Sequence, residues 1–461
     1  MKKLFPSKRG AFVASLVLCL LFSTAVRTQS PSSGRSLAAE LNEYMNAEVA
    51  AGRFSGSVLV ARGGNAIFSK GYGMANREYS VLNSPHTKFR LASVTKQFTS
   101  MAVMILKESG KLDLSAPICK YLENCPAAWE QVTVRHLLAQ TSGIPDFVYS
   151  REFGTLNRTG AAPAALVELV RNQPLNFRPG ERFEYSNINY VLLGLIIEHV
   201  SGRAYDAFLK ENIFDPLGMK DSGYDDISTI LPGRASGYNY DKERLSPVNT
   251  RYVDIRLPFA AGALYSTTED MLRWDNGLST GRLVSRGSMD EIFSPVKSGY
   301  AYGWAASKHL GRIAISHTGI VNGFRTSIRR YPGDRLSIIV LSNFEPARVV
   351  TISSALAAIV FGKPHSRPVA RKTVKVASAI LKSYEGTYRG ENVTVAITPG
   401  ADKLMVKMDG LPEFDLLPGP DGTFFNDYLD VEVRFQKDAK GDVTRLKAHA
   451  LWWAEIEATR D

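Results

Sequence analysis

Cysteine and histidine are both scarce in this sequence, with three and seven residues among 461. The histidines show no H-x-x-H or H-x-H spacing, and the cysteines are too few for a zinc site. No glycine-rich phosphate loop, internal repeat or low-complexity segment is found. A basic helix with an aromatic platform is also missing, which argues against nucleic-acid binding. The sequence therefore predicts no metal, no cofactor and no nucleic-acid partner.

Long apolar runs are limited to the first residues of the chain. Four basic residues precede an apolar run at 11–21, and three small residues follow it. This order predicts a signal peptide, residues 1–25, with cleavage after Ala25; an uncleaved anchor is the alternative. Cys19 follows Leu18, so the small residue that precedes a lipidated cysteine is absent. We expect an exported protein, periplasmic or secreted.

If residues 1–25 are removed on export, two cysteines remain, Cys119 and Cys125. In an oxidising compartment, two cysteines that bracket a short loop are expected to form a disulfide. Two free buried thiols are the alternative. Their spacing does not match a redox C-x-x-C motif.

Positive charge exceeds negative charge. The formal net charge is +11, and loss of the four basic residues of the leader would lower it by four, to +7. Apart from a short basic run near 367–375, the charges are scattered along the chain. A basic surface favours contact with an anionic cell wall or membrane face, so contact with the cell wall remains open.

The chain divides into two parts of different pattern, joined at residues 363–379, where proline and basic residues indicate a linker. Residues 37–362 mix helix and strand patterns, whereas residues 380–461 alternate like strands and predict a small all-β domain. Helix patterns are found near 37 and at 98–106, 162–171, 190–200, 267–278 and 349–360, and strand patterns at 54–61, 66–68, 313–316, 324–331 and 336–341.

Ser93 and Lys96 form the first candidate for chemistry. The apolar run after Lys96 stops at Gly110, which predicts a helix with Ser93 in its first turn. The two residues would share one face, with the hydroxyl beside free backbone N–H groups. A lysine there can polarise or deprotonate the serine, which is the arrangement of an activated nucleophile. A helix-capping serine followed by a solvated lysine is the alternative.

Two similar patterns are interpreted as chance. Ser294 and Lys297 have the same S-x-x-K spacing, but Pro295 follows the serine and a loop-like segment comes next. Residues 277–281 match the G-x-S-x-G elbow of α/β-hydrolases. That elbow joins a strand to a helix, whereas here a helix precedes it and a loop follows, so we expect a helix end with a turn.

Two further short motifs lie at element boundaries, where side chains can join Ser93 and Lys96 in a catalytic site. Tyr185-Ser186-Asn187 directly precedes an apolar helix pattern, and His317-Thr318-Gly319 lies at a strand edge. Together with Ser93 and Lys96, they resemble the three signature motifs of the serine β-lactamase and penicillin-binding-protein superfamily. Tyr185 is similar to the tyrosine of the class C β-lactamase branch, which also holds family VIII esterases and D-aminopeptidases. Further phrases typical of that branch lie at 136–143, 261–267 and 302–304.

The resemblance covers about residues 37–362 and implies the fold class. It is an α+β fold of the β-lactamase/transpeptidase-like kind, with an antiparallel sheet flanked by helices and a helical subdomain. Residues 380–461 resemble the small β domains that are appended to such hydrolases.

The resemblance also implies acyl transfer to Ser93. Lys96 and Tyr185 are the two candidates for the general base. A neighbouring ammonium should lower the pKa of Tyr185 below its usual value of about 10. Backbone N–H groups of Ser93 and Ile320 would form the oxyanion hole, each contributing roughly 3–4 kcal/mol of transition-state stabilisation.

Substrate contacts are implied for five residues, namely Asn187, His317, Gly319, Asn343 and Arg348. Asn187 would orient a substrate amide or, failing that, the Lys96 ammonium. Many β-lactamases have lysine at the position of His317, and a mostly neutral imidazole is a poorer clamp for the carboxylate of a β-lactam. Asn343 and Arg348 resemble a strand end that faces a substrate carboxylate; a helix start with a solvated arginine is the alternative.

We therefore expect an exported serine hydrolase that forms an acyl-enzyme on Ser93. Its substrate would be an ester, a D-amino-acid peptide or an amide, including a small molecule or a peptidoglycan-derived peptide. A true class C-like β-lactamase is one alternative. A catalytically silent cell-wall-binding protein is another, although a silent descendant has no reason to keep Ser93, Lys96 and Tyr185. The sequence leaves the oligomeric state open.

Overall fold

The computed structural model describes residues 36–241, 246–365, 373–391, 393–408, 413–426, 429–449 and 456–461. The signal peptide predicted for residues 1–25 lies outside the described residues. None of the helices in these ranges is both long and apolar enough to cross a membrane. No group of three or more potential metal-ligating side chains occurs in them either.

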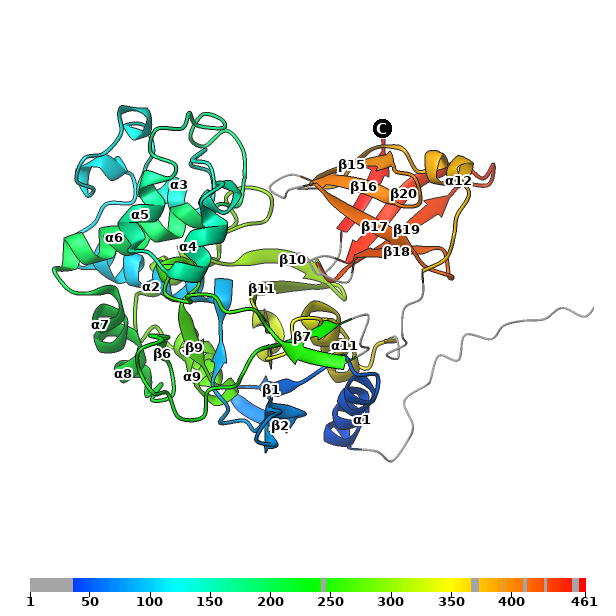
Figure 1. The fold of residues 1–461 in the computed structure, drawn as a ribbon, viewed down its shortest axis with the longest axis horizontal. Helices are drawn as coiled ribbons and strands as arrows, with labels where there is room; N and C mark the ends of the chain where they lie inside the picture. The colour runs from blue at the N-terminus through cyan, green and yellow to red at the C-terminus, as the bar shows by residue number, and fades with distance from the viewer. Residues whose placement is uncertain are drawn as a thin grey trace, which may run out of the picture. The chain divides into compact units, whose positions relative to one another are not determined.

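A six-stranded antiparallel sheet of order β10-β11-β12-β13-β1-β2 forms the centre of the first domain (Figure 1). Its strands are β1 Gly56–Arg62, β2 Asn65–Tyr72, β10 Ala305–His309, β11 Arg312–Val321, β12 Phe324–Tyr331 and β13 Leu336–Ser342. β1 and β2, which correspond to the strand patterns at 54–61 and 66–68, form a hairpin with Gly63 and Gly64 at the positive φ that its turn requires. Pairing of β1 with β13 joins the two ends of the domain.

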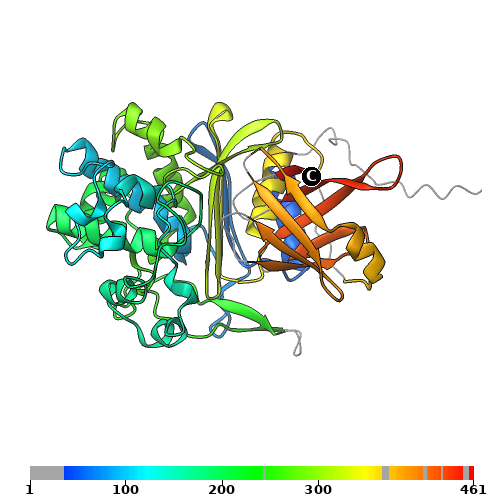
Figure 2. The same ribbon diagram turned by 90° about the horizontal axis from the view of Figure 1, so that it is seen from above.

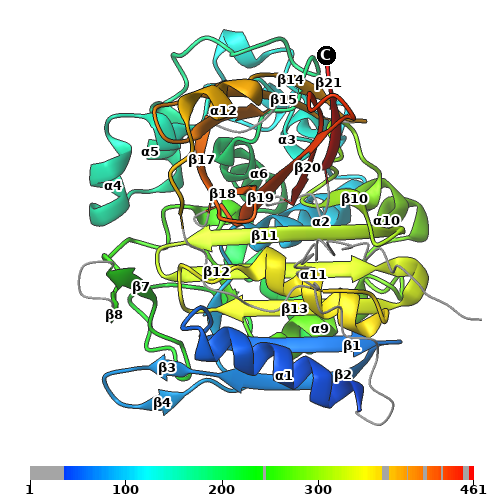
Figure 3. The same ribbon diagram turned by 90° about the vertical axis from the view of Figure 1, so that its right-hand side faces the viewer.

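Both faces of this sheet are buried, and the period of two along each strand divides the side chains between them. Val58 and Val60 of β1 pack on one face, whereas Leu59 packs on the other. β13 repeats the pattern with Ile338 and Ile339. Figures 2 and 3 show the covering helices, which are α1 Leu37–Ala50 and α11 Val349–Val360 on one face and α2 Thr95–Glu108 and α9 Thr268–Gly277 on the other.

Further helices form a subdomain beside α2, and α6 lies at its centre. α6 is continuously apolar from 190 to 197, is buried along most of its length, and ends at Gly202 in the left-handed conformation. The helix expected at 162–171 is shorter and ends at Glu168. The helices are α3 Val134–Leu138, α4 Phe153–Thr159, α5 Pro163–Glu168, α6 Asn187–Ser201, α7 Tyr205–Leu209, α8 Asp215–Leu217 and α10 Arg286–Phe293.

Short strand pairs connect these layers. They are β3 Met74–Asn76 with β4 Val81–Leu82, β5 Phe89–Arg90 and β6 Gly223–Tyr224 with β9 Leu264–Ser266, and β7 Tyr238–Asp241 with β8 Ser246–Asn249. A disulfide joins Cys119 and Cys125, whose Cα atoms lie 5.2 Å apart. Cys119 is the middle residue of the short 3-10 turn Ile118–Lys120, and the disulfide closes the six-residue separation that follows it.

The C-terminal domain is a closed eight-stranded antiparallel barrel. Alternate residues such as Val395 and Ile397, or Leu404 and Val406, fill its interior, as the period of two predicts. The all-β prediction is confirmed, and α12 Ser378–Ser383 precedes the barrel. Its strands are β14 Gly386–Arg389, β15 Thr394–Pro399, β16 Leu404–Met408, β17 Phe414–Pro418, β18 Thr423–Asn426, β19 Val431–Lys437, β20 Val443–His449 and β21 Ile456–Arg460.

Candidate active site

Ser93 lies in a strained turn directly before α2. The 3-10 turn Ala92–Val94 precedes the α-helix, which starts at Thr95, so the serine sits one turn earlier than the sequence pattern suggested. Ala92 has φ +50°, a left-handed conformation that non-glycine residues rarely adopt. Such outliers persist where the surrounding structure enforces them, and they cluster at functional sites. The turn presents the Ser93 hydroxyl at the N-terminal end of α2.

Gly319 of the third motif allows β11 to approach this turn. A Cβ atom at Gly319 would lie 2.2 Å from the backbone oxygen of Leu91 and 3.0 Å from the Cβ of Ala92. The hydroxyl of Thr326 donates to the same Leu91 oxygen at 2.8 Å. Only glycine fits at that distance, so β11 runs directly against the segment before Ser93, and Ile320 is the next residue along it.

Lys96 is fully buried and directed at the serine. Its Nζ lies 3.2 Å from Ser93 Oγ, 2.9 Å from Asn187 Oδ1 and 2.8 Å from the backbone oxygen of Ala261. The last two oxygens only accept hydrogen bonds, so they take two N–H groups and leave the third direction for the hydroxyl. Burial lowers the pKa of Lys96 to about 7, although the charge of Asp146 acts in the opposite direction. In the neutral amine, that third direction is a lone pair that can accept the serine proton.

Asp146 is a site residue that the sequence interpretation missed. Its Oδ2 accepts hydrogen bonds from the backbone N–H of Asn187 at 2.9 Å and from Asn187 Nδ2 at 2.8 Å. Because a carboxylate only accepts, Nδ2 must face Asp146 and Oδ1 must face Lys96. Asn187 therefore orients the Lys96 amine, the second of its two expected roles. The signal was present, since Asp146 lies only three residues after the family phrase at 136–143.

Tyr185 is positioned from both sides by Gln140. The backbone N–H of Glu184 donates to the Gln140 backbone oxygen at 2.9 Å, and that of Ser186 donates to Gln140 Oε1 at 3.0 Å. Gln140 itself has a positive φ of 59°. Between these two anchors, the Tyr185 ring lies beneath Lys96, with Nζ 4.9 Å from the ring centroid.

The expectation that Lys96 lowers the pKa of Tyr185 is wrong. Burial raises the pKa of Tyr185 well above its usual value, although a hydrogen bond with Ser93 acts in the opposite direction. The amine lies over the ring face, and loss of hydration dominates. Tyr185 is therefore a neutral phenol that can donate a proton, and Lys96 is the better base of the two candidates.

His317 is buried and neutral. Its Nδ1 lies 2.7 Å from the backbone oxygen of Thr318, which only accepts, so Nδ1 bears the proton. Nε2 lies 3.1 Å from the Tyr300 hydroxyl and accepts from it. Burial lowers the pKa of His317 to about 3, and the charge of Lys96 lowers it further. The single N–H of this imidazole is thus held by the backbone, and substrate binding by His317 stays a prediction.

Asn343 and Arg348 are engaged within the fold. Asn343 is fully buried; its Nδ2 donates to the backbone oxygens of Met74 and Ser236, and its Oδ1 accepts from Asn83. Arg348 is not a solvated arginine, because its Nε donates to Asp430 of the barrel at 3.1 Å. That carboxylate also accepts from the backbone N–H groups of Val350 and Thr351 at the start of α11. The roles of both residues in substrate binding stay predictions.

The geometry agrees with what comparisons with known proteins find. The sequence profile of the Beta-lactamase family matches residues 37–359. Penicillin-binding protein 4* of Bacillus subtilis (strain 168) is 32% identical over 410 residues, which cover 83% of this chain and 90% of that protein.

Two solved structures extend the comparison. The octameric penicillin-binding protein homologue from Pyrococcus abyssi aligns with a TM-score of 0.65 and 25% identity, over 91% of this chain and 99% of that chain. The D-amino acid amidase of Ochrobactrum anthropi SV3 aligns with a TM-score of 0.59 and 25% identity, over 67% and 92%. The chain belongs to the β-lactamase-related family of serine hydrolases.

Proposed function

We propose that this protein hydrolyses a short ester, amide or D-amino-acid peptide through an acyl-enzyme on Ser93. One observation supports this most directly. A fully buried lysine, whose pKa is lowered to about 7, has its Nζ 3.2 Å from the Ser93 hydroxyl. A lysine of that pKa is about half neutral near pH 7, which suits a general base.

The proton path follows from the side chains around Ser93. Neutral Lys96 takes the Oγ proton while Oγ attacks the carbonyl carbon, and the N–H groups of Ser93 and Ile320 stabilise the oxyanion. When the tetrahedral intermediate collapses, the phenol of Tyr185 donates its proton to the leaving group. The Lys96 ammonium returns a proton to Tyr185. Water then adds to the ester carbon and gives one proton to Lys96. As the second tetrahedral intermediate collapses, the Lys96 ammonium returns that proton to Ser93 Oγ, which releases the acid and regenerates the free serine and the neutral amine.

An ester or amide substrate is favoured over a β-lactam. A β-lactam has a carboxylate that a cation beside the nucleophile would attract. At the equivalent place this chain has His317, a buried neutral imidazole whose N–H is bonded to the Thr318 oxygen. The similarity to a D-amino acid amidase supports the amide and D-amino-acid classes.

A substrate panel tests this proposal. The purified protein is assayed with p-nitrophenyl esters, D-aminoacyl and L-aminoacyl p-nitroanilides, and nitrocefin, with intact-mass detection of the adduct. We expect ester or D-anilide turnover, little nitrocefin hydrolysis, and an acyl adduct mapped to Ser93. Nitrocefin turnover faster than that of every ester and anilide would favour the β-lactamase alternative. No adduct with any substrate would contradict the proposal.

Export is the second part of the proposal. The basic and apolar leader at residues 1–25 supports it, and the disulfide between Cys119 and Cys125 suits an oxidising compartment. N-terminal sequencing of the protein recovered from the periplasm or the medium should begin at residue 26. Recovery of the intact chain from the cytoplasm alone would contradict it.

A further inference from the structure

A cavity of about 630 Å³ lies apart from the residues of the proposed proton path. Its walls come from the segments 227–237 and 249–253, with Arg90 of β5 and Phe324 of β12. This volume falls within the range of small-molecule sites. We name it the arginine cavity, because Arg90, Arg234 and Arg251 line it.

Two of these arginines are held in place by one buried carboxylate. Asp225 has no exposed surface; it accepts from Arg90 Nε at 2.8 Å and from Arg234 Nη1 at 2.6 Å. Each guanidinium has five N–H donors, and no other hydrogen bond holds these two side chains within the described ranges. The pair therefore keeps one net positive charge and several donors in a fixed position.

Arg251 adds a second positive charge. It is exposed and makes no ion pair with any residue that the structure describes. Among the described carboxylates near the cavity, Asp226 and Glu78 already accept hydrogen bonds from its loops. Asp226 accepts from the backbone and hydroxyl of Ser228, and Glu78 accepts from Asn249. The guanidinium donors thus outnumber the acceptors available to them.

The arginine cavity is close to the nucleophile along the chain. Arg90 precedes Ser93 by three residues, so their Cα atoms lie within about 11 Å of each other. The guanidinium of Arg90 lies over the ring of Phe324, 5.6 Å from its centroid. Phe324 pairs with Val321, the neighbour of Ile320 on β11. One substrate could therefore reach both Ser93 and this cavity.

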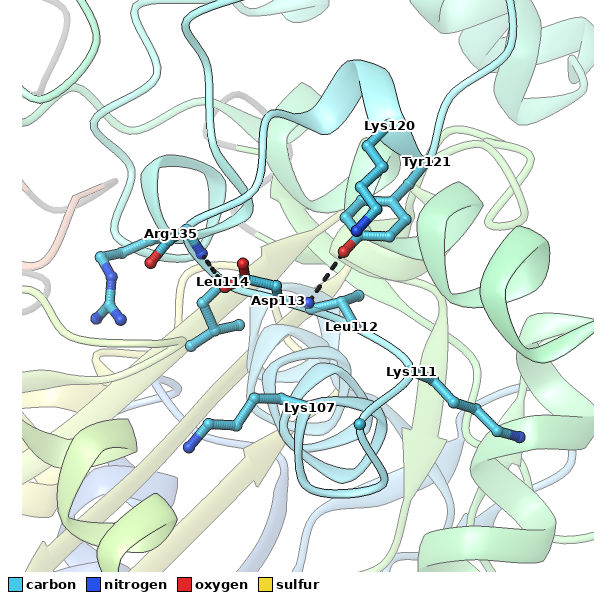
Figure 4. A pocket seen from close by; sticks show the side chains of 10 residues that line it. Lys107, Lys111, Leu112, Asp113, Leu114, Lys120, Tyr121 and Arg135 are labelled. Carbon is cyan, nitrogen blue, oxygen red and sulfur yellow. Dashed lines mark hydrogen bonds between the residues drawn. The ribbon is translucent and has the colours of Figure 1, made fainter.

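Another cationic hollow lacks this relation to the site. It measures about 390 Å³ and is lined by Lys107, Lys111, Lys120 and Arg135 (Figure 4). Lys107 is in the last turn of α2, whose 14 residues separate it from Ser93 by about 20 Å. In Figure 4 the amino groups of Lys107 and Lys111 point away from each other. This second hollow therefore serves as the control site, where a surface charge can be changed far from Ser93.

We infer that the arginine cavity binds a carboxylate of the substrate at a distance from the bond that is cleaved. The substrate class would be an ester or peptide whose chain ends in, or bears, a carboxylate. The exposed side chains of Ile230 and Tyr252 beside the arginines would contact its apolar part. This inference rests on the proposed function, since it names the class of substrate for the same nucleophile.

Two matched esters test the inference. Mono-p-nitrophenyl suberate has a distant carboxylate, and its methyl ester is neutral but otherwise equal. For each variant we compare kcat/KM for the acid with kcat/KM for the methyl ester. In Arg251→Glu this ratio should fall about tenfold or more, the loss expected for a charge-assisted hydrogen bond. Lys111→Glu, which makes the same charge change at the other hollow, should leave that ratio unchanged. An equal ratio in wild type and Arg251→Glu would overturn the inference.

A binding measurement separates this inference from the proposed function. Free suberate is titrated calorimetrically into Ser93→Ala and into Ser93→Ala with Arg251→Glu. We expect a weaker affinity by about tenfold in the double variant. Arg251→Gln replaces Arg251→Glu if the latter does not fold, as judged by circular dichroism. If wild type cleaves neither ester, the proposed function fails, and absence of suberate binding to Ser93→Ala would overturn the inference independently.

Discussion

The S-x-x-K spacing occurs twice in this molecule, and the two copies have opposite surroundings. Lys96 has no exposed surface, and its Nζ lies 3.2 Å from Ser93 Oγ. Lys297 is exposed, and its ammonium donates to the backbone oxygen of Glu181. Ser294 is exposed as well and stands at the end of α10 in an extended conformation. Equal spacing therefore gives a serine in contact with a buried lysine in one place and two exposed side chains in the other.

Burial and partner geometry make the difference. Around Lys96, two N–H groups donate to Asn187 Oδ1 and to the Ala261 oxygen. The remaining tetrahedral position of the nitrogen, which is a lone pair in the neutral amine, therefore faces the serine. Loss of hydration then makes the neutral amine accessible near pH 7. Lys297 has neither feature, so its copy of the motif provides a control for each variant at Ser93 or Lys96.

The largest effect is expected from loss of the nucleophile. Ser93→Ala should reduce p-nitrophenyl ester turnover at least about 10⁴-fold, since no acyl-enzyme can form. Ser294→Ala removes the same atom from an exposed position and should stay within about twofold of wild type. Steady-state rates and intact mass measure both. An acyl adduct on Ser93→Ala would show that another residue is the nucleophile.

Loss of the base should come next. Lys96→Met keeps the volume but removes the amine, and kcat should fall about 10²- to 10⁴-fold, whereas Lys297→Met should have little effect. In wild type, kcat/KM should rise with pH through about 7, because only the neutral amine accepts the proton. His317 has a pKa near 3 and cannot cause that rise. If kcat/KM of Lys96→Met still rose with pH through about 7, a group other than Lys96 would have to cause the rise.

A smaller loss is expected at Tyr185. Tyr185→Phe keeps the ring beneath Lys96 but removes the hydroxyl, and kcat should fall about 100-fold. The loss should be greater for anilides than for p-nitrophenyl esters, because an amine leaving group needs a proton and a nitrophenolate does not. Comparison of the two substrates in Tyr185→Phe measures this. Equal losses would indicate that Tyr185 positions Ser93 rather than donating a proton.

Most of the fold could be predicted from pattern alone. The continuous apolar run of β1 and the apolar faces of α2 and α11 each extend over neighbouring residues, so a window of ten residues contains the signal. The barrel was recognised as all-β, yet short strands such as β17 and β18 gave no clear pattern, since their pairing with neighbours defines them. Ser93 is expected in the first turn of the helix but lies in the 3-10 turn directly before it, because a turn of three residues is too short to show a periodicity of its own.

The site was only partly predictable, because its properties arise from contacts between distant segments. Motif order indicated Ser93, Lys96 and Tyr185. The sequence predicts a lowered Tyr185 pKa, whereas burial raises it. A nearby ammonium can be inferred from sequence, but the depth at which a side chain is buried cannot. The ion pair of Arg348 could not be predicted for a similar reason, and its role in substrate binding stays a prediction. Its partner Asp430 lies in another domain, 82 positions along the chain.

The smallest effect is expected at Asp146, which acts on Lys96 through Asn187. Asp146→Asn keeps an oxygen that can accept from the Asn187 N–H groups but removes the negative charge. That charge favours the protonated lysine, so its loss should lower the pKa of Lys96 below about 7. The rise of kcat/KM should then move to lower pH, by about one pH unit, the size of shift that loss of one neighbouring opposite charge produces. The maximal rate should change only a few-fold.

This shift distinguishes an electrostatic role of Asp146 from a structural one. If Asp146 only held Asn187 in place, its replacement would lower the maximal rate and leave the pH of half-maximal activity where it was. Asp113→Asn is the matched control, because it removes a carboxylate that is exposed at the opposite end of α2. Its profile should coincide with that of wild type. If the active form of Lys96 were the ammonium, kcat/KM would fall instead of rise as the pH passes the lysine pKa, and that fall would move to lower pH in Asp146→Asn. The order of proton transfers proposed above would then have to be reversed.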